Sequence, residues 1–111
     1  MFSEDVNAQI ASELSNAEAA RAAGNEGKAR VCARRAAGAA VREYLRLTGQ
    51  SAQGSAYELL GQIQAQTVIS QQVKQAAEYL RLKVDTDYTL PEQIDLILEA
   101  RILAQGLEQV V

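Results

Sequence analysis

Apolar residues recur at intervals of three and four along most of this chain, which is the spacing of an amphipathic helix. The first stripe follows Ser3 and the acidic residues Glu4 and Asp5, which favour a helix start. Gly24 and Asn25 come after it and predict the end of one helix and the cap of the next. The stripe consists of Val6, Ile10, Leu14 and Ala17, with Arg21 in register.

Residues 25–49 predict one long second helix, and the short turn before it predicts an antiparallel hairpin with the first helix. Its core side is rich in alanine, so neighbouring helices can approach closely if they supply larger side chains. The residues expected to face the core are Ala29, Ala33, Ala36, Ala37, Ala40, Tyr44 and Leu47. The opposite side carries a basic stripe of Lys28, Arg35, Arg42 and Arg46.

Two shorter helices are predicted after the loop that follows Gly49. Ser55 caps the first, whose Gly61 predicts either a close contact or marginal stability. A β-branched stretch at residues 67–69 breaks the pattern before Ser70 caps the second. The residues expected to point inward are Ala56, Leu59, Leu60 and Ile63 in the first, and Val73, Ala76, Ala77, Leu80 and Val84 in the second.

The last helix is predicted to start at a capping box in residues 89–92, which includes Pro91. It carries one apolar stripe of Leu96, Ala100, Leu103 and Leu107, and a second of Ile94, Leu98 and Ile102. A helix with two apolar sides is either central or shared with a second subunit, and we favour a subunit contact because so small a bundle has little interior. Arg30 and Arg34 also fall beside apolar residues, which suggests buried ion pairs or an interface. The predicted dimer interface therefore comprises Arg30, Arg34, Ile94, Leu98 and Ile102.

These patterns predict an all-α fold, an up-and-down bundle of four or five helices with two long antiparallel helices at the N-terminus, in one domain over residues 1–111. A single cysteine forms no internal disulfide, and no stretch is apolar enough to span a membrane. The first residues do not resemble a secretory signal, so we expect a cytoplasmic protein that does not enter membranes.

The chain has no histidine, which excludes imidazole catalysis and histidine-based zinc sites, and we expect neither a metal nor a cofactor. Cys32 lies among basic residues but has no evident base partner, so packing is its expected role. The run from Gly24 to Lys28 lacks the Ser or Thr that would complete a phosphate loop. The basic stripe remains as a candidate polyanion-binding surface, with a solvated helix face as the alternative.

Asp85, Asp87 and Thr89 match the DxDxT string of haloacid-dehalogenase-like phosphatases. That chemistry requires a parallel sheet, and the chain shows no succession of strands, so an acidic turn is the simpler interpretation. A histidine-free nuclease or a small phosphotransfer enzyme using Asp85 and Asp87 remains the alternative to a binding protein.

The chain resembles the HEPN (higher eukaryotes and prokaryotes nucleotide-binding) domain family in the run GNEGKARVCARRAAGAAVREYLRLTGQSAQGSAYELLGQI. Residues 24–47 are similar to the family's helical hairpin, residues 55–60 to its short helix, and residues 92–107 to its last helix. The resemblance implies a homodimeric bundle that binds a nucleotide, RNA or a protein partner such as a nucleotidyltransferase-like protein.

Catalytic members of that family are ribonucleases with an arginine followed by histidine four to six residues later in the last helix. Arg101 matches the arginine, but Gly106, Leu107 and Glu108 stand near the position of the histidine. We therefore predict a non-catalytic binding or accessory module. The hairpin turn also resembles a tetratricopeptide repeat, which makes a protein-interaction module of that kind a further alternative, although no second copy follows at that repeat's spacing.

Overall fold

The computed structural model describes residues 1–82 and 94–111. In these ranges the chain forms five helices and no strand, and all five helices contribute to one hydrophobic core. The helices are α1 (Glu4–Ala22), α2 (Glu26–Leu47), α3 (Ala56–Gln64), α4 (Gln71–Arg81) and α5 (Leu96–Gln109). The predicted all-α helical bundle is confirmed.

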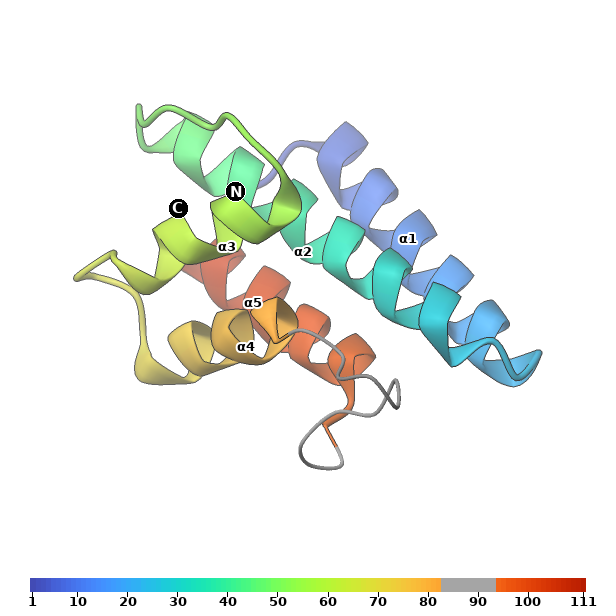
Figure 1. Cartoon of the computed structure of the whole chain (residues 1–111). Helices are drawn as coiled ribbons and strands as arrows, with labels where there is room; N and C mark the ends of the chain where they lie inside the picture. Colours follow the sequence, from blue (N-terminus) through green and yellow to red (C-terminus); the bar gives the residue numbers. More distant parts are fainter. Residues whose placement is uncertain (83–93) are drawn as a thin grey trace.

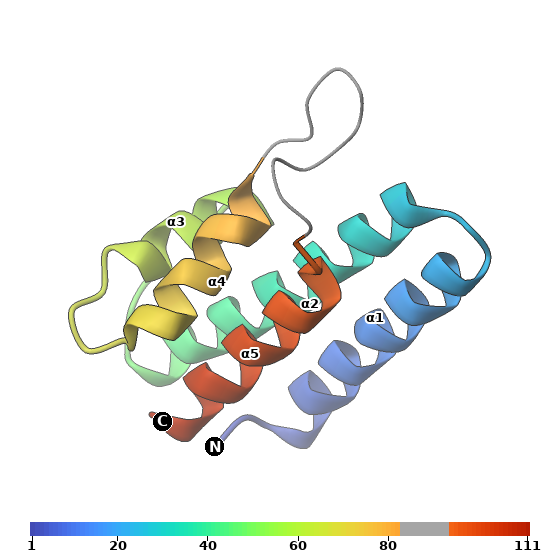
Figure 2. The ribbon, with the colours of Figure 1, turned by 90° about the horizontal axis from the view of Figure 1, so that it is seen from below.

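Helix α2 lies at the centre of this bundle. Helices α1 and α2 form an antiparallel hairpin, α5 packs beside α2, and α3 and α4 cover the remaining side (Figure 1). Viewed from below, α5 lies between α4 and α1, and the two chain ends lie close together (Figure 2). The basic helix that the sequence singled out is therefore also the scaffold on which the other helices pack.

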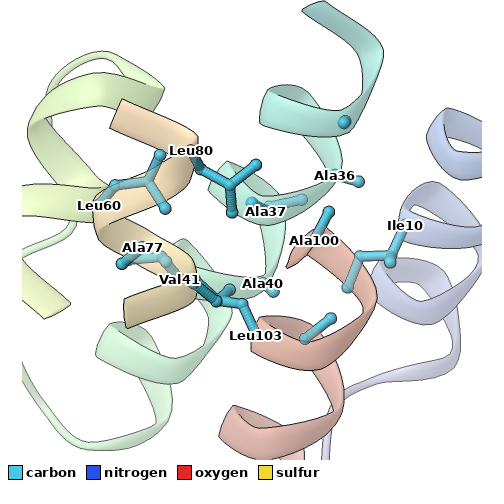
Figure 3. Packing of buried hydrophobic residues seen from close by; sticks show 14 of the residues in the cluster. Ile10, Ala36, Ala37, Ala40, Val41, Leu60, Ala77, Leu80, Ala100 and Leu103 are labelled. Atoms are coloured by element: carbon cyan, nitrogen blue, oxygen red, sulfur yellow. The ribbon is translucent and has the colours of Figure 1, made fainter. Parts of the chain in front are cut away.

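Alanine on α2 allows this central position. Ala36, Ala37 and Ala40 are fully buried, and the neighbouring helices supply the larger side chains that the composition required. Figure 3 shows Ala37 and Ala40 between Leu60 and Leu80 on one side and Leu103 on the other. Because a methyl group occupies so little volume, the neighbouring helices can approach α2 closely.

The helix boundaries follow the capping residues seen in the sequence. Ser3, Asn25, Ser55 and Ser70 each accept a hydrogen bond from a backbone N–H in the first turn of the helix that follows. Gly24 has φ +80°, a left-handed conformation that lets the chain reverse between α1 and α2.

Two sequence predictions need correction. Leu47 was expected in the core, but it is 40% exposed because it occupies the last turn of α2, beyond the reach of its neighbours. The capping box at residues 89–92 lies outside the described residues, as does Val84, and the described helix begins only at Leu96. Ile94 therefore precedes α5 instead of lying in it, because the Asp95 side chain caps the helix by accepting from the N–H groups of Ile97 and Leu98.

Gly61 marks a close contact, one of the two alternatives that its place in α3 suggested. The Arg81 guanidinium lies over the Tyr57 ring, 4.2 Å from the ring centroid, and donates to Gln64 Oε1 at 2.8 Å. A Cβ atom on Gly61 would lie 3.1 Å from Arg81 Cζ. The missing side chain leaves room for this cation–π pair between α3 and α4.

Candidate functional site

Three of the four residues in the basic stripe form an exposed row along α2. Lys28, Arg35 and Arg42 are exposed, and none of them makes an ion pair within residues 1–82 and 94–111. Two helical turns separate neighbouring members, a rise of about 10 Å. That distance is about three nucleotides along a stacked strand, at about 3.4 Å per nucleotide.

Arg46, the fourth member, is engaged within the chain. Its Nε donates to Glu43 Oε1 at 2.7 Å, and this hydrogen bond raises the pKa of the guanidinium. We therefore define the basic face of α2 as Lys28, Arg35 and Arg42.

A shallow groove of about 240 Å³ lies between the two arginines of the basic face. Gly38 and Ala56 form part of its floor, and a Cβ atom on Gly38 would lie only 3.0 Å from the Cβ of Ala56. Glu13 of α1 also lines it. The groove is thus lined both by small residues, where α2 and α3 approach closely, and by Arg35 and Arg42, and guanidinium groups match phosphate oxygens geometrically.

Arg34 is used inside the chain. Its Nε donates to the carbonyl of Leu80 at 2.8 Å and its Nη2 to the carbonyl of Leu82 at 2.9 Å. Burial, followed by the charge of Arg30, lowers the pKa of Arg34. Its hydrogen-bond partners at the end of α4 are carbonyls and not carboxylates, which differs from the buried ion pair that we considered, and its place in a subunit contact stays a prediction. It supplies the last carbonyls of α4 with the donors that a helix end lacks.

The other predicted interface residues differ in exposure. Arg30 is largely buried, with its Nε 4.0 Å from Glu26 Oε2, which agrees with the ion-pair alternative. Ile94 and Ile102 pack against the core, whereas Leu98 is 52% exposed. Of the three apolar residues, Leu98 alone presents most of its surface to solvent, and its role in a dimer stays a prediction.

The remaining chemical candidates are Cys32 and the two aspartates of the DxDxT string. Cys32 is buried, as its packing role requires. Asp85 and Asp87 lie outside the described residues. Within the part of the chain that the structure describes, no three of the cysteine and carboxylate side chains gather into a metal-binding group.

Residues 106–108, which the sequence resemblance sets near the histidine of catalytic HEPN members, make internal contacts in this chain. A Cβ atom on Gly106 would overlap Cγ2 of Val73, so α4 and α5 are in contact there. Leu107 is fully buried, and Glu108 Oε2 accepts hydrogen bonds from Phe2 N–H and from Asn7 Nδ2. Arg101 donates to Glu18 Oε1 at 3.2 Å. A histidine at residue 106 would displace Val73.

Sequence reasoning missed two polar centres that hold the bundle together. Arg21 donates to both carboxylate oxygens of Glu26 and to Asp95 Oδ1, which ties the ends of α1, α2 and α5. The hydrogen bond from Arg21 lowers the pKa of Glu26, and the same bond raises that of Arg21. The sequence feature that could have indicated this polar centre is the position of Arg21 on an apolar stripe.

Glu43 is the second missed centre. Its side chain is 3% exposed, yet its pKa is lowered to about 2, first by the hydrogen bond from Arg46 and then by the backbone N–H of Ser3. The position of Glu43 in the sequence could have indicated its burial, because it lies three residues after Ala40 and therefore on the alanine side of α2.

Comparison with known proteins adds no relative. No family model, no curated protein and no solved structure matches this chain. Among the helices of the described ranges, none combines the length and the apolar character needed to cross a lipid bilayer.

Proposed function

We propose that this chain is a non-catalytic, HEPN-like binding or accessory module that acts as a homodimer and holds the phosphates of a nucleotide or RNA on the basic face of α2. One observation carries the proposal: Lys28, Arg35 and Arg42 are exposed, aligned and without an ion pair in the described ranges. Every other arginine in these ranges has a carboxylate, carbonyl, amide or aromatic partner.

The energetics of the basic face suit a phosphate ligand. Surface cations that make no internal ion pair break no such pair when they bind phosphate, and they release counterions from a nucleic acid. Two arginines beside a shallow groove supply two planar donors, whereas Lys28 adds a point charge two turns away. The net charge of −3 confines the attraction to this face.

Several features support binding without cleavage. The chain contains no histidine, and Gly106, one of the three residues near the family's histidine position, packs against Val73. The module therefore binds its ligand with cations and lacks the imidazole that acts in catalytic relatives.

The test is fluorescence anisotropy with a labelled single-stranded RNA, titrated at several salt concentrations. With three phosphates neutralised, we expect log K against log salt to have a slope of about −2. Arg35→Glu and Arg42→Glu should each weaken binding by about tenfold. Lys74→Glu on α4 is the matched control, because it makes the same change in charge away from the basic face, and it should change affinity less than twofold.

Two results would contradict the proposal. If the wild type binds neither RNA nor nucleotide at low salt, the proposed phosphate ligand is excluded. If Arg35→Glu and Lys74→Glu lower the affinity for RNA equally, the effect comes from net charge alone and not from the basic face. RNA incubated with the protein and magnesium should stay intact. Cleavage that disappears in Asp85→Asn would establish the enzyme alternative instead.

A further inference from the structure

The groove beside the basic face is lined by a carboxylate as well as by cations. Arg35 and Arg42 of α2 contribute guanidinium groups, which only donate hydrogen bonds, whereas α1 contributes Gln9 and Glu13. Helices α1 and α2 lie side by side along this groove (Figure 1). Gln9 and Glu13 are four residues apart, so they share one side of α1. A negative charge therefore stands beside the surface proposed to hold phosphate.

Glu13 is partly buried, yet its carboxylate makes no hydrogen bond or ion pair within residues 1–82 and 94–111. Glu18, one helix face away on α1, shows the contrast. It lines a second groove, of about 450 Å³ between α1 and α5, and accepts a hydrogen bond from Arg101 Nη2 at 3.2 Å. In the described part of the chain, Glu13 therefore has both carboxylate oxygens available to a ligand.

The chemistry of a carboxylate restricts which ligand can use it. Phosphate and an ionised carboxylate are both hydrogen-bond acceptors with negative charge, so a phosphate bound by Arg35 and Arg42 gains nothing from Glu13. Glu13 strengthens binding only if the ligand presents a donor beside its phosphates. The backbone of RNA has such a donor in the 2′-hydroxyl of each ribose, and the backbone of DNA has none.

The groove suits the backbone of a strand better than its bases. None of the described residues that line it is aromatic, so a base finds no stacking surface there. Its volume of about 240 Å³ is smaller than the about 300 Å³ at which pockets for whole small ligands begin. One sugar–phosphate unit of a longer strand is therefore a better occupant than a free nucleotide.

We propose that Glu13 determines the specificity of the basic face: its carboxylate accepts a hydrogen bond from a ribose 2′-hydroxyl while Arg35 and Arg42 bind phosphates of the same strand, so that the surface selects RNA over DNA. Bound DNA meets the charge of Glu13 without a donor to offset the repulsion, which makes it the weaker ligand. The inference rests on the proposed function, which supplies the phosphate contacts, and adds the discrimination between the two backbones.

The test is fluorescence anisotropy with three labelled strands of one sequence, made of RNA, 2′-O-methyl RNA and DNA. The 2′-O-methyl group keeps the ribose oxygen and removes its donor hydrogen, so this strand separates the hydrogen bond from the shape of the backbone. Wild type should bind RNA about tenfold more tightly than either of the other strands, as expected for one hydrogen bond to a charged group.

Glu13→Ala should bring the three affinities within about twofold of one another, because RNA loses its acceptor and DNA loses a repulsive charge. Glu13→Gln keeps an acceptor oxygen, so its preference for RNA should fall between those of wild type and Glu13→Ala. Glu78→Ala on α4 is the matched control, since it removes the same charge from an exposed position outside the groove. It should leave the ratio of RNA to DNA affinity unchanged.

Equal binding of RNA and 2′-O-methyl RNA by the wild type would overturn this inference and leave the phosphate contacts of the proposed function intact. A preference for RNA that survives in Glu13→Ala would do the same. If Glu13→Ala strengthens binding of RNA and DNA by one common factor, Glu13 acts only as a general repulsive charge. A wild type that binds none of the three strands contradicts the proposed function itself and this inference with it.

Discussion

The backbone N–H of Ser3 donates a hydrogen bond to Glu43 Oε2 at 3.1 Å, across 40 residues of sequence. Arg46 donates to the other oxygen of the same carboxylate at 2.7 Å. Ser3 is also the N-cap of α1, where its hydroxyl accepts from the N–H of Val6. One buried carboxylate on α2 thus fixes the position at which α1 begins.

The first prediction concerns the pH dependence that this carboxylate imposes. The pKa of Glu43 falls from 4.5 to about 2 on folding, so the folded state prefers the ionised form. Its stabilising contribution is complete above the unfolded value and is lost as the pH falls from about 4.5 to about 2. Urea unfolding should therefore show a falling midpoint in this window, with a smaller fall in Glu43→Gln.

Glu43→Ala tests the same contact at neutral pH. It should lower the free energy of unfolding by about 1.5–3 kcal/mol, the usual range for a hydrogen bond to a charged group. Glu43→Gln keeps an acceptor for Ser3 and should cost less. If the acid fall is equally steep in wild type and Glu43→Gln, the carboxylate does not carry the pH dependence.

The second prediction compares two glycines in helices. Gly106→Ala should destabilise the protein, because overpacking costs about 1–3 kcal/mol and the new Cβ atom would overlap Cγ2 of Val73. Gly27→Ala on α2 is the matched control, since the nearest atom to its new Cβ would be 3.8 Å away, at Asn25 Oδ1. It should stabilise the protein by up to about 1 kcal/mol through helix propensity.

A double variant identifies the cause of the Gly106→Ala loss. Combined with Val73→Ala, Gly106→Ala should cost less than the sum of the two single changes, because the smaller residue makes room for the new methyl group. Additive losses measured by urea unfolding would show that contact with Val73 is not the reason.

The third prediction separates two adjacent arginines. Arg34→Ala should lower the free energy of unfolding by about 1.5–3 kcal/mol, because the carbonyls of Leu80 and Leu82 lose a charged donor. Arg35→Ala, one residue away on the exposed basic face, should stay within about 0.5 kcal/mol of wild type.

Amide hydrogen exchange locates the effect of Arg34→Ala. Protection should fall most in the last turn of α4, residues 79–82, and little in α1. Arg34→Lys keeps the charge but not the two-pronged donor, so it should fall between wild type and Arg34→Ala. Equal stabilities of the Arg34→Ala and Arg35→Ala variants would remove the structural role given to Arg34.

Much of the fold was readable from short-range pattern. Each helix cap binds a backbone N–H three residues further on, so the local sequence is enough to predict it. The caps are Ser3, Asn25, Ser55 and Ser70. The alanine side of α2 was readable for the same reason, because residues three and four apart share a helix face. The exposure of Lys28, Arg35 and Arg42 also followed from that spacing.

Local spacing could not predict which contacts the residues of the candidate surfaces make. Arg30 and Arg34 look alike in sequence, yet the first lies beside Glu26 and the second binds the end of α4. Arg46 shares a stripe with Arg42 but belongs to the buried Glu43. The groove between α1 and α5 requires two helices about 90 residues apart to lie side by side.

The amino-acid sequence by itself determined which segments are helical, which face of each turns inward and where four of the five helices begin, because those properties depend on neighbours within one or two turns. Only the tertiary structure decided which arginines form hydrogen bonds or ion pairs within the chain and which remain exposed on the basic face. It also decided that α5 begins at Leu96, with Asp95 as its cap, and that Arg101 and Glu108 line one groove. These outcomes depend on which distant groups meet when the helices pack, and spacing along the chain does not contain that information.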